Sequence, residues 1–168
     1  YATIEDTITG DTREVNTNPL TNYNVFVVDQ NLKNNSTISF TNTNVWRSGE
    51  TYDANVMSLI VDAYTKGQRY NIWGIGNLSK KFYSSGLDLG HSYSLGLEKS
   101  AGSFTGGLVY EEIGENYDPN DLGFNLVQNV RTISLSSRYN WFKPFGRFNR
   151  AWVAVWMGHK RIINPDAY

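Results

Sequence analysis

Residues 87–112 alternate between apolar and polar side chains for longer than soluble strands usually allow. Every second residue from Leu87 to Leu97 is apolar, aromatic or histidine, and the residues between them are small or polar. After a break at 100–103, the alternation resumes from Phe104 to Tyr110. Only an extended strand has this period of two. Soluble strands are most often about five or six residues long, whereas a membrane-spanning strand needs about nine to eleven. The segment therefore predicts a transmembrane β-hairpin.

The rest of the chain repeats this unit. Further strands are expected at 23–30, 37–46, 57–63, 70–78, 132–141 and 150–157. Together with the first hairpin they make about eight strands in four hairpins. Residues 1–22 are expected to form a surface loop, 23–160 a meander of β-hairpins, and 161–168 a loop.

The connections between the expected strands alternate in length. Short turns are expected near Asn34, Gly67, Ala101 and Gly146, and long loops near 49, 84 and 120. Outer-membrane barrels have short periplasmic turns and long outer loops. The fold predicted is all-β, an antiparallel up-and-down transmembrane β-barrel. The loop-like ends of the chain favour a section of a larger barrel.

Composition excludes several other classes. The 15 basic and 16 acidic residues nearly cancel, which argues against a nucleic-acid partner, since such surfaces are usually basic. There is no cysteine and only two histidines, so a thiolate or histidine-rich metal site is not expected. The sequence contains no run of about eighteen apolar residues, so no membrane-spanning helix is predicted. No cofactor is expected.

Charged side chains agree with a polar lumen. In the clearest strands they all fall between the apolar positions: Asp62, Glu98, Glu111, Arg138 and Arg150. A lysine or arginine facing lipid at mid-membrane costs about 2–4 kcal/mol. Two strands are less regular, since Phe26, Val28, Trp73 and Ile75 are expected to point into the lumen, where a folded-in loop could cover them.

Aromatic residues are abundant, and they gather near the ends of the expected strands. Tyrosine and tryptophan favour membrane–water interfaces, so we interpret them as two girdles. The alternative is a sugar-binding platform. The girdle residues are Trp46, Tyr52 and Tyr83 at one end and Tyr70, Trp141, Phe142, Phe145 and Phe148 at the other.

Three segments resemble a known family. They are NTNVWR (42–47), YDANV (52–56) and, most specifically, YDPNDLGF: Tyr117, Asp118, Pro119, Asn120, Asp121, Leu122, Gly123 and Phe124. Together they are similar to an uncharacterised outer-membrane family of Bacteroidota, over most of residues 22–143. The resemblance implies a barrel region of unknown function that follows a carbohydrate-binding-module-like domain. It carries no catalytic residue over to this chain.

The same acidic loop has two interpretations. Asp118, Asn120 and Asp121 offer oxygen ligands for Ca²⁺, but they lack the ligand order of an EF-hand loop. The favoured interpretation is a set of Asx and type I turns in which Gly123 supplies a positive φ. Enzyme activity is not expected. Glu111 and Glu112 point to opposite faces of a strand, so they cannot flank one glycosidic bond.

These patterns lead to one expectation and two alternatives. We expect an integral protein of a Gram-negative outer membrane, in contact with lipid, with a channel, transport or scaffold role and a link to saccharides. The first alternative is a soluble β-sandwich or barrel that binds carbohydrate. The second is a structural subunit that works with other outer-membrane proteins.

Overall fold

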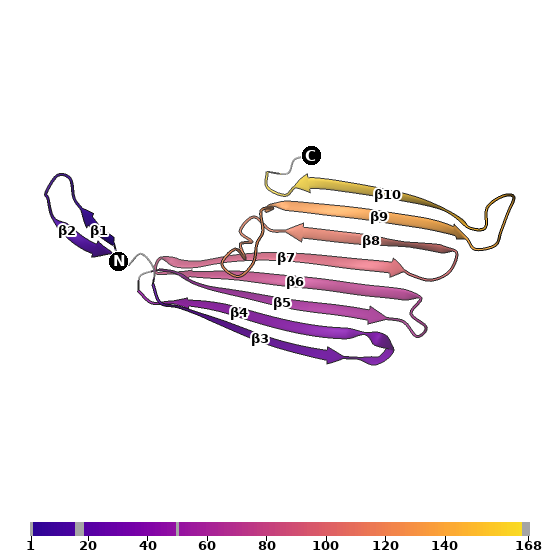
Figure 1. The fold of residues 1–168 in the computed structure, drawn as a ribbon, viewed down its shortest axis with the longest axis horizontal. Helices are drawn as coiled ribbons and strands as arrows, with labels where there is room; N and C mark the ends of the chain where they lie inside the picture. Colours follow the sequence, from indigo (N-terminus) through magenta and orange to yellow (C-terminus); the bar gives the residue numbers. More distant parts are fainter. Residues whose placement is uncertain (1, 16–18, 50, 166–168) are drawn as a thin grey trace.

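The computed structural model describes residues 2–15, 19–49 and 51–165, which form an eight-stranded antiparallel sheet and a separate two-stranded hairpin (Figure 1). The hairpin pairs β1 (Ala2–Glu5) with β2 (Thr12–Val15). The strands of the sheet are β3 (Thr21–Asn31), β4 (Thr37–Arg47), β5 (Asp53–Tyr64), β6 (Tyr70–Tyr83), β7 (Gly86–Lys99), β8 (Phe104–Ile113), β9 (Val130–Trp141) and β10 (Ala151–Ile162). A 3₁₀ turn occupies Lys33–Asn35.

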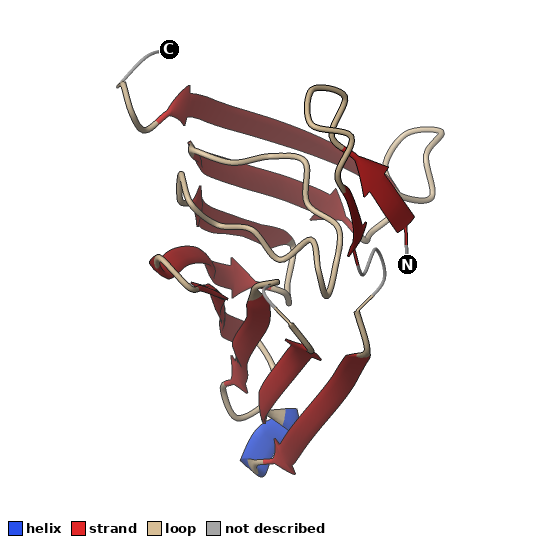
Figure 2. Ribbon diagram, turned by 90° about the vertical axis from the view of Figure 1, so that its left-hand side faces the viewer, coloured by secondary structure: helices blue, strands red, loops and turns tan. Residues whose placement is uncertain are grey.

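Each strand of the sheet pairs with its neighbours in sequence, in the order β10-β9-β8-β7-β6-β5-β4-β3. The predicted all-β antiparallel meander is therefore confirmed. Figure 2 shows the strands following a curved arc whose two ends stay apart. Among the described residues β3 and β10 do not pair, so these eight strands do not close into a small barrel by themselves.

Two expectations about the connections are wrong. Residues 1–22 are not only a loop, because β1 and β2 pair around a turn in which Asp6 Oδ1 accepts a hydrogen bond from the Ile8 amide (2.8 Å). The lengths of the connections do not sort by side either. Only Ser84 and Ser85 separate β6 from β7, whereas residues 142–150 separate β9 from β10. The long loop expected near 84 is mostly strand, since β6 continues to Tyr83 and β7 begins at Gly86.

We call the end of the sheet beside the connection 114–129 the loop end. The opposite end, beside the connections 32–36, 65–69, 100–103 and 142–150, is the turn end. Strands of the sheet run 10 to 14 residues between them.

One side of the sheet, the apolar face, carries a band of apolar side chains across all eight strands. Directly opposite residues of paired strands share a face. One row of such residues is Ile38, Val61, Gly74, Leu95, Tyr110, Ile133 and His159, and the next is Ala63, Ile72, Leu97, Leu108, Leu135 and Met157. In β3 to β10 the charged residues of this face lie near strand ends: Asp53, Lys80, Glu112, Arg131 and Arg161 at the loop end and Lys99 at the turn end.

The opposite side, the polar face, carries serine, threonine, asparagine and most of the charged residues of the strands, among them Asp62, Glu98, Glu111 and Arg138. Trp73 and Ile75 lie there as expected. The expectation for Phe26 and Val28 is wrong. Val28 lies opposite Phe40, which is on the apolar face, and Phe26 is two residues away on the same strand. Phe26 and Val28 therefore both belong to the apolar face. Val25 and Val27 occupy the polar face instead, because a run of β-branched residues fits either register.

Very little of this sheet is covered. The chain exposes 12173 Å², whereas a compact soluble protein of this size exposes about 8,400 Å². Side chains of the apolar band remain exposed, and Leu95 and Leu97 are each 54% exposed. In the part of the chain that the structure describes, the buried apolar residues are Val45, Ala54, Tyr117 and Val130, all toward the loop end. The described part of the chain contains no helix long and apolar enough to span a membrane.

Candidate functional site

Residues 114–129 fold back over the polar face at the loop end. Below them Val45, Ala54 and Ser79 are almost completely buried, with 0%, 4% and 3% exposure. The amide of Asp118 donates a hydrogen bond to Ser79 Oγ (3.1 Å), and that of Gly114 donates to the His91 carbonyl (2.9 Å). The segment is therefore docked on the strands β4 to β7.

Gly90 lets the loop come this close. A Cβ at this position would lie 2.1 Å from the Asn116 carbonyl oxygen and 2.4 Å from Tyr117 Cα. Backbone atoms cannot yield as a flexible side chain can, so only glycine fits under the docked loop.

Side chains from three parts of the chain join the loop to the rest of the protein. We call them the loop-docking cluster: Arg47, Tyr52, Lys81, Asp118 and Asp121. Arg47 Nη2 and the Tyr52 hydroxyl both donate to Asp121 Oδ1, at 2.5 Å and 3.0 Å. Lys81 Nζ donates to Asp118 Oδ2 (2.6 Å) and lies 3.6 Å from Asp121 Oδ2. The Tyr52 ring lies against both cations, at 4.7 Å from Arg47 Cζ and 5.2 Å from Lys81 Nζ.

The ion pairs of the loop-docking cluster are largely buried, so they are screened less by water than surface pairs are. The side chains of Arg47, Lys81 and Asp121 are only 15%, 12% and 11% exposed. The hydrogen bond from Lys81 lowers the pKa of the Asp118 carboxyl, although burial acts in the opposite direction. Burial, followed by the hydrogen bond to Asp121, raises the pKa of the Tyr52 phenol.

The acidic loop contains the hydrogen bonds that the turn interpretation requires. Asp118 Oδ1 accepts a hydrogen bond from the Asn120 amide (3.0 Å), which makes an Asx turn, and Leu122 N donates to the Pro119 carbonyl (2.8 Å). Asp118 pairs with Lys81 and Asp121 with Arg47, so both carboxylates already have a cationic partner within the protein. The expected positive φ of Gly123 is wrong, since its φ is not positive.

We expect Gly90→Ala to displace the loop. The added methyl group would overlap the loop backbone, and overpacking of this kind costs about 1–3 kcal/mol. The rate of chymotrypsin cleavage after the buried Tyr117 should rise about tenfold, relative to cleavage of a free peptide of residues 114–129.

Gly76→Ala is the matched control, because a Cβ at Gly76 meets nothing within 4 Å. An equal effect of the two substitutions, or none from Gly90→Ala, would contradict the role of Gly90.

Acid is expected to release the loop as well. The folded pKa of Asp118 is lowered, so this carboxylate contributes stability above its ordinary pKa of about 4. That contribution is lost as the pH falls through the folded value. Pepsin cleavage after Tyr117, normalised to the same free peptide, should therefore rise as the pH decreases below about 4. A flat normalised rate would show that the pair between Lys81 and Asp118 does not hold the loop.

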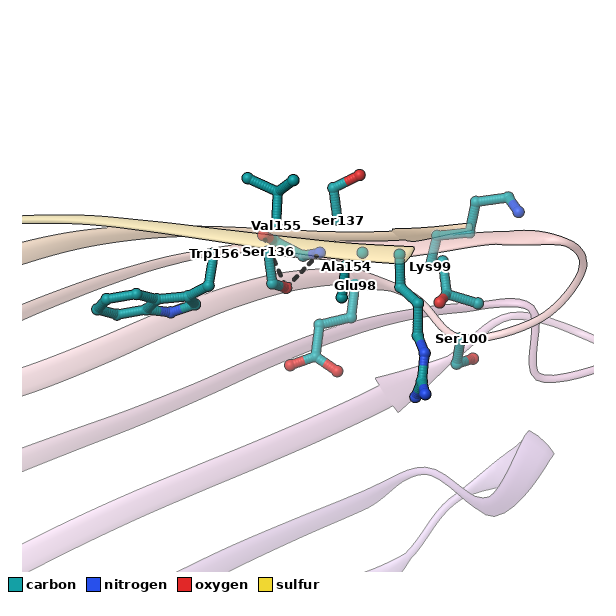
Figure 3. Close-up of a pocket in the computed structure, with 12 residues that line it drawn as sticks. Glu98, Lys99, Ser100, Ser136, Ser137, Ala154, Val155 and Trp156 are labelled. Carbon is teal, nitrogen blue, oxygen red and sulfur yellow. Dashed lines mark hydrogen bonds between the residues drawn. The ribbon is translucent and has the colours of Figure 1, made fainter. Parts of the chain in front are cut away.

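A second feature of the polar face is a groove of about 530 Å³ across β7 to β10. Its floor is made of small residues, Gly107, Ser136 and Ala154, and Glu98, Arg138 and Trp156 border it. Figure 3 shows Glu98 and Trp156 on one side of the strands, with Val155 and Ser137 on the other.

Trp156 lines the groove, and two further tryptophans contact the charged residues that border it. Trp156 is 71% exposed, the Arg138 guanidinium lies 4.3 Å from the Trp152 ring, and Trp73 Nε1 donates to Glu98 (3.0 Å). A flat ring, a carboxylate and a guanidinium around an open floor suit a polyhydroxylated ligand, which needs both an apolar surface and hydrogen-bond partners.

The aromatic residues predicted as girdles divide into two groups. Tyr70 and Trp141 lie on the apolar face at the turn end, where the rings of Trp141 and Phe145 are 6.1 Å apart and those of Phe145 and Phe148 are 5.7 Å apart. Phe142 follows Trp141 and is exposed, and Trp46 lies on the apolar face at the loop end.

Tyr52 and Tyr83 are placed differently. Their rings are 4.9 Å apart, and they belong to the polar side, where Tyr52 hydrogen-bonds the loop-docking cluster. Neither ring lies on the apolar face, because the Tyr52 hydroxyl donates a hydrogen bond to Asp121 and Tyr83 lies against the Tyr52 ring.

Sequence reasoning identified the loop but missed its partners. The sequence predicts Asp118 and Asp121 as candidate ligands, and Arg47 enters only as the last residue of the motif 42–47. Lys81 and Gly90 occupy the polar side of their strands, a position that does not by itself indicate contact with a loop. The groove at Trp156 was likewise not predicted, although Trp152 and Trp156 alternate with small residues in β10.

One of the comparisons with known proteins identifies a family. The model described as "Domain of unknown function (DUF5916)" matches residues 1–168, so the chain belongs to this family. No curated protein matches the chain, and no solved structure matches it.

Proposed function

We propose that this member of the DUF5916 family forms part of the wall of an outer-membrane β-barrel, with its apolar face toward lipid and its polar face toward the lumen. The observation that carries the proposal is the apolar band, which crosses all eight strands, remains uncovered and has charged residues only near strand ends. A soluble sheet with this band open to water would lose the burial that normally stabilises a fold.

The dimensions of the band support this assignment. On β9 the apolar face carries no charged residue from Ile133 to Trp141, which at about 3.3 Å per residue is about 26 Å along the strand. Strands of a bacterial barrel are tilted by about 35–45° and its outward apolar band is about 25 Å tall, so this stretch would cross most of the band. Gly74 and Gly76 leave a groove of about 480 Å³ on this face, lined mainly by apolar residues such as Leu59 and Leu95, which suits a lipid acyl chain.

The two unpaired edge strands support a barrel with more strands than these eight. β3 and β10 have 11 and 12 residues and lie at the two edges of the sheet. A long edge strand is a template for pairing with another strand, and membrane strands need every backbone group satisfied. Further strands of the same barrel would pair with both edges. In that barrel the loop 114–129 would lie inside the lumen and narrow it.

Flotation with phosphatidylcholine vesicles tests the proposal. The protein should float with the vesicles and resist extraction by alkaline carbonate. A protein that remains folded and monomeric in plain buffer, and does not float, would contradict it and favour a soluble carbohydrate-binding domain. A third possibility, a structural subunit of a larger complex, predicts that a second protein co-purifies in a fixed ratio.

We further propose that a saccharide binds to the polar face, in the groove at Trp156. Trp156→Ala should weaken the binding of a maltooligosaccharide about tenfold. Losing roughly 50 Å² of ring contact, at about 25 cal/mol per Å², corresponds to this factor. Quenching of tryptophan fluorescence during titration measures the affinity.

Trp46→Ala is the matched control, because Trp46 is exposed on the apolar face. Equal losses from the two variants would indicate a soluble protein that binds sugar on both faces. No loss from Trp156→Ala would exclude the groove as the sugar site.

A further inference from the structure

The connections at the turn end carry positive charge only. They contain no aspartate or glutamate, and they contain six basic residues: Lys33, Lys66, Arg69, Lys143, Arg147 and Arg150. All six are exposed, and none of them forms an ion pair with a residue that the structure describes. The connection 114–129 at the loop end is the reverse, with three acidic residues and no basic one. The turn end is therefore the end of the sheet that attracts anions.

The longest of these connections, 142–150, contains a defined turn. The Phe145 amide donates a hydrogen bond to the Phe148 carbonyl (2.9 Å), and the Phe148 amide donates to the Phe145 carbonyl (3.0 Å). Gly146, with a φ of 55°, and Arg147 lie between these two residues, so Arg147 is held at the tip of the turn. Figure 1 shows the connection between β9 and β10 reaching beyond the other connections at the turn end.

A pocket of about 560 Å³ lies beside this turn. Ser103 and Lys143 line it, together with four aromatic rings: Tyr139, Trp141, Phe142 and Phe145. Tyr139 and Trp141 belong to the apolar face, so the pocket lies where the apolar band meets the charged turn end. Aromatic rings beside a cation suit a ligand that is apolar at one side and anionic at the other.

The acidic residues of the strands do not supply that anion. Among the described residues, those closest to the turn end along β3, β5 and β7 are Asp29, Asp62 and Glu98, and all three belong to the polar face. Asp62 and Glu98 also accept hydrogen bonds from neighbouring side chains. Lys143 is exposed and forms no ion pair with a described residue, so its ammonium group is accessible to an external anion.

We propose that this pocket binds one anionic phospholipid. The phosphate of the lipid would pair with Lys143, and its glycerol and first acyl methylenes would pack on the rings of Trp141 and Phe145. The other cations of the turn end would attract anionic lipid toward the pocket, because each lysine or arginine near an anionic membrane surface favours binding. This inference rests on the proposed function, since it requires the apolar face to contact lipid.

Lipid retention in nanodiscs tests the proposal. The protein is placed in phosphatidylcholine discs that contain a minority of phosphatidylglycerol, and the lipids that remain bound after release into detergent are counted by native mass spectrometry. The protein should retain phosphatidylglycerol in preference to phosphatidylcholine, and the preference should decrease as sodium chloride screens the charges. Lys143→Gln should reduce the preference about fivefold. Ser103→Phe, which fills the pocket and removes no charge, should also reduce it.

Lys160→Gln is the matched control, because it removes the same charge from an exposed position of the polar face at the loop end, opposite Thr132. A wild-type protein that enters the discs without preferring phosphatidylglycerol would overturn the lipid site and leave the proposed function intact. The same holds if Lys160→Gln acts as strongly as Lys143→Gln, or if Ser103→Phe has no effect, because surface charge alone would then explain the retention. Failure to enter discs of phosphatidylcholine alone would overturn both proposals.

Discussion

Replacing Asp121 by alanine should release the loop 114–129 from the polar face, at a cost of about 3–5 kcal/mol to the docked state. Asp121 is the acceptor shared by Arg47 and Tyr52 and lies within 3.6 Å of Lys81. Its removal would leave Arg47 buried beside Lys81 without its carboxylate. Removing one member of a buried ion pair is this costly because the remaining charge stays desolvated.

Chymotrypsin cleavage after Tyr117, normalised to the free peptide, measures the effect. The open fraction should rise by about a hundredfold or more. Asp118→Ala is the matched control with a smaller expected effect, because Asp118 is 30% exposed and Lys81 keeps Asp121 as a neighbour. If the two alanine variants behave alike, the cluster does not depend on Asp121. If neither changes cleavage, the ion pairs do not hold the loop.

Leu95→Arg should prevent stable insertion into a bilayer, whereas Ser94→Arg should be tolerated. Leu95 lies in the middle of β7 on the apolar face, opposite Gly74 and Tyr110. An arginine facing lipid at mid-membrane costs about 2–4 kcal/mol. Ser94 lies on the polar face opposite Glu111, whose carboxylate accepts a hydrogen bond from its hydroxyl (3.4 Å), so an arginine there meets an anion.

The free energy of unfolding in phosphatidylcholine vesicles, obtained from guanidinium titration of tryptophan fluorescence, separates the two variants. A loss of about 2–4 kcal/mol for Leu95→Arg and less than about 1 kcal/mol for Ser94→Arg is expected. Equal losses would mean that the two faces of β7 meet the same environment.

The strands were predictable because the side-chain period of a strand is two. In β7 and β8 that period alone assigns each residue to its face, and the register confirms it from Leu87 to Glu112. The period could not place Phe26 and Val28, since the run from Val25 to Val28 is apolar on both sides. It also could not find the end of β6, where Lys80 and Lys81 suggest a loop but pair within the sheet.

The site was only half predictable for a different reason. Asp118 and Asp121 form a recognisable acidic turn, but their partners are distant in sequence: Arg47 is 74 residues from Asp121 and Lys81 is 37 residues from Asp118. Nothing local indicates that a loop between β8 and β9 docks on β4 to β7. Gly90 offers no signal at all, because its role depends on the backbone of Asn116 lying above it.

Single cysteines test the membrane orientation most directly, because the chain has no cysteine of its own. A fluorescent label is attached at Leu95→Cys or Leu135→Cys on the apolar face and at Ser94→Cys or Ser134→Cys on the polar face, in vesicles that contain brominated lipid. The proposal predicts that the lipid quenches the labels at 95 and 135, and that aqueous iodide quenches those at 94 and 134. Iodide quenching of all four labels alike, without quenching by the brominated lipid, would contradict it.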